Sequence, residues 1–147
     1  MLKYVATALT LSAAALAVFV WAGPSEIRHY TAEELAELTC EALGERHEEV
    51  IVAYHDADIA HYRRTGSFDG GVGLPPEDVM PFAVLIKRFI RDSGISETDV
   101  MDASSLTPIL SSDFYYAISA KCATNPSWQV VDAMQKAAID LDLIKGP

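Results

Sequence analysis

Two cysteines, Cys40 and Cys122, lie far apart in an acidic chain that begins with an apolar leader. They constrain the fold more than any other feature, because one covalent bond between them would close most of the chain into a single loop. Cysteines that reach an oxidising compartment normally form a disulfide. The sequence therefore predicts a Cys40–Cys122 disulfide, and the alternative is a pair of buried free thiols.

The leader, residues 1–22, has one basic residue, Lys3, followed by a long apolar run. This composition is typical of a secretory signal peptide that is cleaved at its end. The run is also just long enough to span a bilayer and includes Trp21 near its end, so the alternative is a membrane anchor that retains residues 4–22. Because Lys3 favours a cytoplasmic N-terminus, both interpretations place residues 23–147 in the periplasm or an equivalent space.

The chain is strongly acidic, with 21 Asp and Glu against 11 Lys and Arg residues and a formal net charge of −10 at pH 7. Nucleic acid is not an expected partner, because phosphate binding requires a basic surface. Acid would protonate the carboxylates and charge the four histidines, so the net charge would change sign. The composition predicts a stability that depends strongly on pH, although acidity can also serve solubility alone.

Residues 23–147 are predicted to form one all-α domain of roughly four to five helices. Thr31 and Glu34 form a capping-box pattern ahead of an alanine- and glutamate-rich helix that extends to about Tyr62. Gly44 is a potential break within this helix.

A Gly- and Pro-rich loop is predicted over residues 65–76, and a second helix is predicted to begin at Pro75 or Pro76. Gly94 is expected to end this second helix. Its apolar face is the broadest in the chain and is predicted to form the centre of the core. That face consists of Val79, Phe82, Ala83, Ile86, Phe89 and Ile90.

Two more helices are predicted in the last third of the chain. Ser112 is expected to cap a helix that runs through Cys122. Asn125 and Pro126 have the pattern of an N-cap followed by the first residue of the final helix.

Three histidines, His47, His55 and His61, lie among carboxylates in the first long helix. Because their ordinary pKa is about 6.5, they are candidate pH-sensing groups. They do not have metal-site spacing, since His47 and His61 share a helix face but lie about 21 Å apart along the axis. No metal or other cofactor is predicted, and a solvated polar face is the simpler interpretation.

No catalytic residue is predicted. The serines lack the nucleophile-elbow pattern, and Asp56 and Asp58 diverge on a helix instead of converging as an acid–base pair. The chain is therefore expected not to be an enzyme.

The segments Leu38-Thr39-Cys40 and Ala117–Pro126 resemble the HdeA/HdeB family of periplasmic acid-stress chaperones. Leu106-Thr107-Pro108 is similar to a further segment of that family, but it lies farther from Cys122. Members of the family are small exported helical proteins in which one disulfide links two helices. The stretch between the two cysteines is longer here.

The resemblance implies a protein that binds unfolded clients at low pH and is a homodimer at neutral pH. Protonation would loosen the packing while the disulfide keeps the chain compact. Apolar residues exposed in this way would form the candidate client surface. These residues are Phe82, Ile86, Phe89, Phe114 and Tyr115.

Two other classes of protein fit the same sequence. One is a helical periplasmic immunity or inhibitor protein, whose acidic surface would suit a basic toxin. The other is an accessory subunit of an envelope complex, held to the inner membrane by residues 4–22. The partner is in each case a protein.

Overall fold

A computed structural model describes residues 27–146, so the predicted leader lies outside the described residues. The described chain has six α-helices, one short 3-10 helix and no β-strand, which confirms the all-α prediction. None of these helices is long and apolar enough to cross a membrane. The bounds are α2 Ala32–Ala36, α3 Cys40–Thr65, η1 Glu77–Val79, α4 Pro81–Ser93, α5 Glu97–Val100, α6 Asp113–Thr124 and α7 Val130–Asp140.

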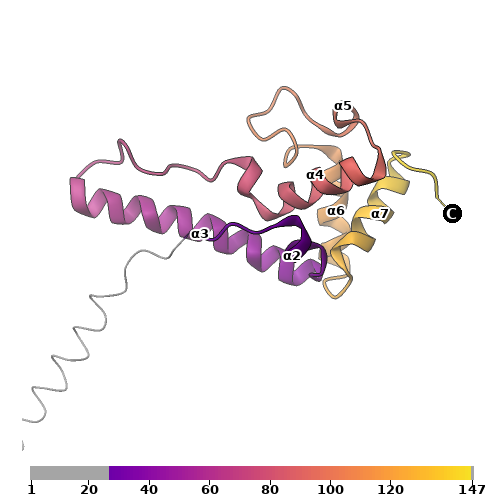
Figure 1. The fold of residues 1–147 in the computed structure, drawn as a ribbon, viewed down its shortest axis with the longest axis horizontal. Helices are drawn as coiled ribbons and strands as arrows, with labels where there is room; N and C mark the ends of the chain where they lie inside the picture. Colours follow the sequence, from indigo (N-terminus) through magenta and orange to yellow (C-terminus); the bar gives the residue numbers. More distant parts are fainter. Residues whose placement is uncertain (1–26, 147) are drawn as a thin grey trace, which may run out of the picture.

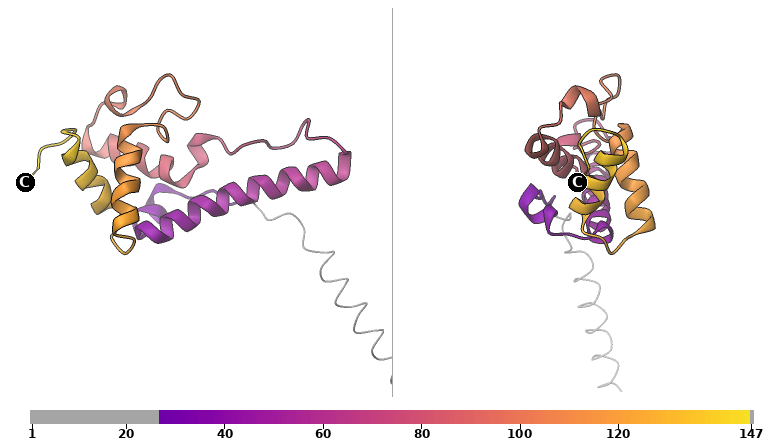
Figure 2. Two further views of the ribbon diagram at one scale, coloured as in Figure 1. Left: turned by 180° about the vertical axis from the view of Figure 1, so that it is seen from behind. Right: turned by 90° about the vertical axis from the view of Figure 1, so that its right-hand side faces the viewer.

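The molecule consists of a helical body and a projecting arm (Figure 1). The first half of α3 packs with α4, α6 and α7, while α2 covers α4. The second half of α3 extends beyond the other helices, and the predicted glycine-rich loop runs back beside it (Figures 1 and 2). Gly66, in the left-handed conformation with φ 75°, ends α3 and allows the chain to reverse.

The prediction of one long helix after Thr31 is wrong at its start. The capping box does form, because Glu34 N donates to Thr31 Oγ1 at 3.3 Å and Thr31 N donates to Glu34 Oε2 at 2.9 Å. The helix that it begins ends at Ala36, after five residues. A second N-cap, Thr39, starts α3, so Cys40 is the first residue of the long helix and not part of the first one. Gly44 does not interrupt α3, which is continuous over 26 residues.

The disulfide between Cys40 and Cys122 forms as predicted and joins residues 82 positions apart in the sequence. Main-chain hydrogen bonds surround it. Cys40 N donates to Trp128 O at 2.9 Å, and Glu41 N donates to Pro126 O at 3.0 Å. These bonds satisfy N–H groups that the first turn of a helix leaves without partners. We call this contact between the start of α3 and the α6–α7 turn the junction.

The junction explains why the last helix does not start where the sequence predicts. Asn125 is the C-cap of α6, and Pro126 lies in the turn that reaches α3. Gln129 forms an isolated antiparallel bridge with Thr39, and it is the N-cap of α7. The chain therefore uses the residues after Asn125 to bond to α3 before helix α7 begins.

Helix α4 also starts later than predicted. The 3-10 helix η1 follows Pro75 and Pro76, and α4 begins only at Pro81. Gly94 ends α4 with a φ of 67°, as predicted. The apolar face of α4 lies in the core, where Ile86 and Ile90 are almost completely enclosed.

The core lies where α3, α4, α6 and α7 meet. Each of these helices contributes a fully enclosed side chain, among them Leu43, Leu85, Ile118 and Met134. Each such burial stabilises the fold by about 1.5–3 kcal/mol. The four longest helices therefore share one core, and α2 and α5 are single turns at its edge.

Replacing both cysteines, Cys40→Ser/Cys122→Ser, is expected to lower the free energy of unfolding by about 2–5 kcal/mol, because the unfolded chain regains the freedom of a long loop. Urea denaturation followed by far-UV circular dichroism at pH 7 measures this loss. A reducing agent should weaken the unmodified protein by a similar amount and leave the variant unchanged. Equal unfolding free energies for the two proteins would contradict the expectation.

Candidate functional site

An aromatic cluster lies between α3, α4 and α6. The rings of His47 and Phe82 meet edge to face, with centroids 5.2 Å apart and an interplanar angle of 70°. Phe82 meets Tyr115 in the same way at 5.6 Å, and Phe89 lies against Phe114 at 5.8 Å. Edge-to-face geometry is favourable for aromatic rings. These five residues, the aromatic cluster, link three helices through ring contacts.

The predicted client surface is not an open surface in this structure. Phe114 and Ile86 are each 1% exposed and Phe82 is 8% exposed. Phe89 and Tyr115 are half-buried and pack against the core. The structure thus brings all five predicted residues together, but it places them inside the folded body.

His47 is the histidine whose surroundings are unusual. The residue as a whole is half-buried, but its Nδ1 atom is buried and has no hydrogen-bond partner in the described chain. Burial lowers the pKa of His47 below its ordinary value, because the charged ring loses its hydration. The unfolded chain therefore binds a proton at this residue more readily than the folded chain does.

The sign of the pH effect follows from this shift. Above about pH 6.5 the ring is neutral in both states, and the contribution of His47 to stability is fully present. As the pH falls from that value through the lowered pKa of the folded state, the unfolded state is increasingly favoured. Mild acid therefore destabilises the packing around His47.

The other two predicted pH-sensing histidines lie on the arm and not in the core. His55 is largely exposed, with Nδ1 3.8 Å from Asp56 Oδ1. His61 Nε2 lies 2.9 Å from the carbonyl oxygen of Asp69 in the loop. The three histidines do not converge, and no group of metal-ligating residues in the described chain has the arrangement of a metal site.

Carboxylates hold the outer elements to the body. Glu33 of α2 pairs with Arg88 of α4 at 2.8 Å, and Asp140 of α7 pairs with Lys121 of α6. In both pairs the carboxylate side chain is largely exposed, so each pair contributes little to stability by itself. Each pair nevertheless joins two helices.

The Glu77 carboxylate accepts two backbone hydrogen bonds. Its Oε1 accepts hydrogen bonds from Ile109 N at 2.7 Å and from Leu110 N at 2.8 Å. Hydrogen bonds to a charged acceptor are stronger than neutral ones. The Glu77 side chain of η1 thereby fixes the loop that leads into α6.

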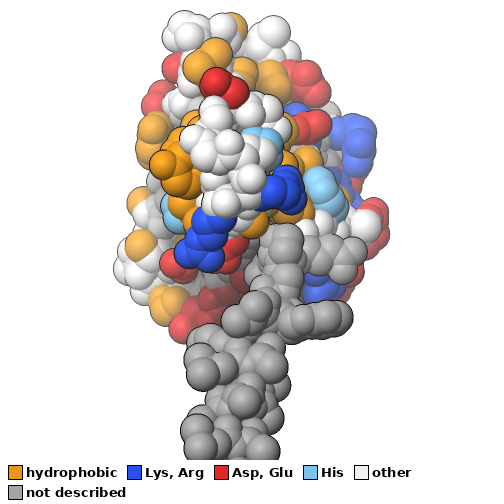
Figure 3. All heavy atoms as spheres, turned by 90° about the vertical axis from the view of Figure 1, so that its left-hand side faces the viewer, with side chains coloured by type: hydrophobic (Ala, Val, Ile, Leu, Met, Phe, Trp, Pro, Cys, Tyr) orange, Lys and Arg blue, Asp and Glu red, His pale blue; other side chains and the backbone are white. Residues whose placement is uncertain are grey.

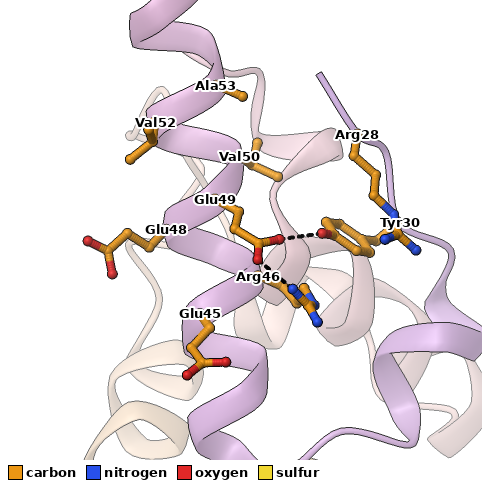
Figure 4. A pocket seen from close by; sticks show the side chains of 9 residues that line it. All are labelled: Arg28, Tyr30, Glu45, Arg46, Glu48, Glu49, Val50, Val52 and Ala53. Atoms are coloured by element: carbon orange, nitrogen blue, oxygen red, sulfur yellow. Dashed lines mark hydrogen bonds and ion pairs between the residues drawn. The ribbon is translucent and has the colours of Figure 1, made fainter. Parts of the chain in front are cut away.

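A groove lies between the N-terminal segment and the middle of α3, with a cavity volume of about 630 Å³ (Figure 4). The Tyr30 hydroxyl donates to Glu49 Oε2 at 2.5 Å, and Arg46 forms an ion pair with the same carboxylate. The hydrogen bond from Tyr30 is the main cause of a lowered Glu49 pKa, and burial is the main cause of a raised Tyr30 pKa. The guanidinium of Arg28 lies over the Tyr30 ring, 4.6 Å from its centre.

Tyr30 is a residue of this groove that the sequence did not predict. It directly precedes the N-cap Thr31, where an apolar residue commonly packs onto the helix that follows, but its hydroxyl bonds to Glu49 of α3. Because Glu49 is bonded to both Tyr30 and Arg46, these contacts hold the N-terminal segment against α3. It does not present a reactive pair of groups.

Comparisons of the chain with protein-family models, with curated proteins and with solved structures find no match. The resemblance to the acid-stress chaperones therefore rests on the residues around Cys40 and Cys122.

The variant His47→Phe is expected to reduce the loss of stability between pH 7 and pH 5, because the phenyl ring fills the site without taking up a proton. One proton changes the unfolding free energy by at most about 1.4 kcal/mol per pH unit, which sets the upper limit of the effect. Urea denaturation at several pH values measures the slope. His55→Phe is the matched control and should leave the slope unchanged; identical slopes for all three proteins would refute the role of His47.

Removing the Glu77 side chain, as Glu77→Ala, is expected to cost about 2 kcal/mol at pH 7, because two backbone N–H donors lose a charged acceptor. Glu77→Gln keeps an acceptor oxygen and should cost less. Chemical denaturation of both variants gives the comparison. Two variants as stable as the unmodified protein would show that the loop is held by other contacts.

Proposed function

We propose that this chain is a non-enzymatic binding protein of the periplasm or an equivalent oxidising compartment, which loosens in acid and then binds unfolded polypeptides. The proposal rests on one observation above all. A histidine with a buried, unpartnered Nδ1 lies against Phe82 in the aromatic cluster. The fold therefore has a proton-sensitive group in contact with an apolar side chain of the core.

The first step is the protonation of His47 in mild acid. A charged imidazolium needs hydration, and the site offers its Nδ1 no acceptor in the described chain. Because Nδ1 is the buried atom of the ring, its hydration requires local separation of the groups that pack on it. Since Phe82 and Tyr115 share this contact, their separation exposes aromatic surface.

The second step is the loss of the carboxylate contacts in stronger acid. The pKa values of Glu34 and Glu49 are lowered by hydrogen bonds from Thr31 and Tyr30, respectively. Their stabilising contributions are present above the ordinary carboxyl pKa and are lost as the pH falls through the lowered values. The chain then carries a large positive charge, and self-repulsion opposes repacking.

The disulfide limits this expansion. It joins the start of α3 to α6, and neither it nor the main-chain bonds at the junction contain a group that titrates in acid. An expanded chain that stays connected at one end of its core exposes apolar side chains without complete unfolding. Such a surface would bind unfolded clients by burying apolar area.

At pH 2–3 we expect increased binding of a hydrophobic dye, loss of the near-UV circular dichroism signal and suppressed aggregation of an acid-unfolded client protein. At pH 7 these properties should return to those of the folded state. His47→Phe should shift the onset of dye binding to lower pH, and His55→Phe should not. A protein that keeps its near-UV signal and binds no dye at pH 2–3 lacks this function.

Two further experiments separate the alternative classes of protein. A single stoichiometric partner bound tightly at pH 7 would indicate an inhibitor or immunity protein. N-terminal sequencing of the native protein tests membrane anchoring, because a protein that starts near Gly23 has lost residues 4–22.

A further inference from the structure

The far end of the arm displays basic and apolar side chains together. Arg63 and Arg64 lie in the last turn of α3, both are exposed, and neither forms an ion pair with another described residue. Across the chain reversal, Phe68 is 57% exposed although its ring stacks on Tyr62 at 4.6 Å. Figure 3 looks onto this end, where basic, histidine and hydrophobic side chains lie next to one another. We call Tyr62, Arg63, Arg64 and Phe68 the arm tip.

The reversal at the arm tip is held by hydrogen bonds of its own. Thr65 Oγ1 donates to the carbonyl oxygen of His61 at 2.9 Å, and His61 Nε2 lies 2.9 Å from the carbonyl oxygen of Asp69. Gly71 N donates to the carbonyl oxygen of Phe68 at 3.1 Å. These bonds hold Phe68 in a defined position, so little conformational freedom is lost when another molecule covers its ring. They also satisfy backbone groups internally, which is a requirement for a segment that contacts an apolar phase.

The loop that runs back from the arm tip adds two exposed apolar side chains. Val72 is 49% exposed and Leu74 is 91% exposed. Between them, Gly73 N donates to Asp58 Oδ1 at 3.1 Å, which holds this part of the loop on the arm. Because Asp58 lies two helical turns before the end of α3, this contact is about 10 Å from the arm tip along the helix axis. Exposed apolar side chains gathered on one short segment mark a surface that contacts a protein or a membrane.

Charge distinguishes the arm tip from the rest of this acidic chain. Residues 59–68 include two arginines and a histidine but no carboxylate, whereas the whole chain has a formal net charge of −10. Asp58 and Asp69 flank this stretch, and Asp58 is already bonded to the loop. An anionic surface therefore repels the molecule as a whole and attracts it at this end, which sets its orientation on the surface.

We propose that the arm tip docks on the headgroup layer of an anionic lipid bilayer. The guanidinium groups of Arg63 and Arg64 bind lipid phosphates, whose geometry they match. Phe68 and Leu74 enter the boundary between headgroups and acyl chains, a depth that suits aromatic and aliphatic side chains beside basic ones. A bilayer fits better than an acidic protein, because a projecting end can enter a soft surface directly, whereas a protein partner needs a cavity that matches it.

The position of the leader agrees with this occupant. Residues 23–26 separate the leader from Ile27, the first described residue, and a chain of this length extends over at most about 18 Å. Arg28 and Tyr30 then lie beside the middle of α3 (Figure 4). A leader retained in the bilayer would therefore hold the arm close to the same surface. The docking itself concerns the folded protein at pH 7 and does not rest on the proposed function.

Hydrogen–deuterium exchange of the full chain at pH 7 tests the docking. Vesicles of phosphatidylglycerol and phosphatidylcholine should slow exchange at residues 66–74, and vesicles of phosphatidylcholine alone should not. The ratio of docked to free arm tips, read from this slowing, should fall at least about tenfold in Arg63→Gln/Arg64→Gln, because each arginine near an anionic surface contributes a factor of about five. Lys136→Gln/Lys145→Gln is the matched control, since it removes the same charge on and beyond α7 and should leave the ratio unchanged.

Two exposed leucines test the apolar contact. Leu74→Ser should lower the same ratio by about three- to tenfold, because a leucine side chain that is partly buried in lipid returns to water. Leu106→Ser is the matched control, since Leu106 is fully exposed in a different loop and its substitution should change nothing. All four variants change exposed side chains, and far-UV circular dichroism verifies that they fold.

Exchange at residues 66–74 that anionic vesicles do not change overturns the proposal, even where the leader brings the chain to the vesicle. Equal slowing by both kinds of vesicle also overturns it. Polyglutamate tests the rival partner: if it slows exchange at these residues and vesicles do not, the arm tip binds an acidic protein and the proposal is wrong. Docking at pH 7 by a protein that binds no client in acid would support this inference and reject the proposed function, so the two fail separately.

Discussion

The junction between the start of α3 and the α6–α7 turn is the contact on which the rest of the structure depends. The Cys40–Cys122 disulfide and the main-chain bonds to Trp128 and Pro126 act at the same place. They set the direction of α3 relative to α6 and α7, and α4 then completes the core against these helices. The projecting arm also follows from the junction, because α3 is held at one end and is longer than the body that packs on it.

Much of this fold was accessible from sequence because its signals are local. The capping box at Thr31, the N-cap at Ser112 and the glycine that ends α4 each depend on residues within one turn. The errors occur where distant main-chain partners compete with local preference. Residues after Asn125 bond to the start of α3 instead of starting a helix. The helix that begins after Thr31 ends before Thr39 for the same reason, because Leu38 and Thr39 pair with the chain around Gln129.

The candidate site was less accessible, because its key property is tertiary. His47, His55 and His61 are identical in type and lie in one helix among similar neighbours. Burial against Phe82 distinguishes His47, and a sequence does not show which side of a helix another helix will cover. Helical spacing places Phe82, Ile86 and Phe89 on one face of α4, but spacing does not separate a core from an open surface.

The outer elements of this fold are held by carboxylates, whereas the junction is held by groups that do not titrate in acid. The outer contacts of α2, η1 and α7 use the carboxylates of Glu33, Glu77 and Asp140. The junction uses a disulfide and backbone amides, which do not titrate in acid. In the proposed function, acid acts on His47 and on the carboxylates of Glu34 and Glu49, whose pKa values are lowered, while the junction persists. Under the same proposal, such a chain would open from the outside toward one fixed end.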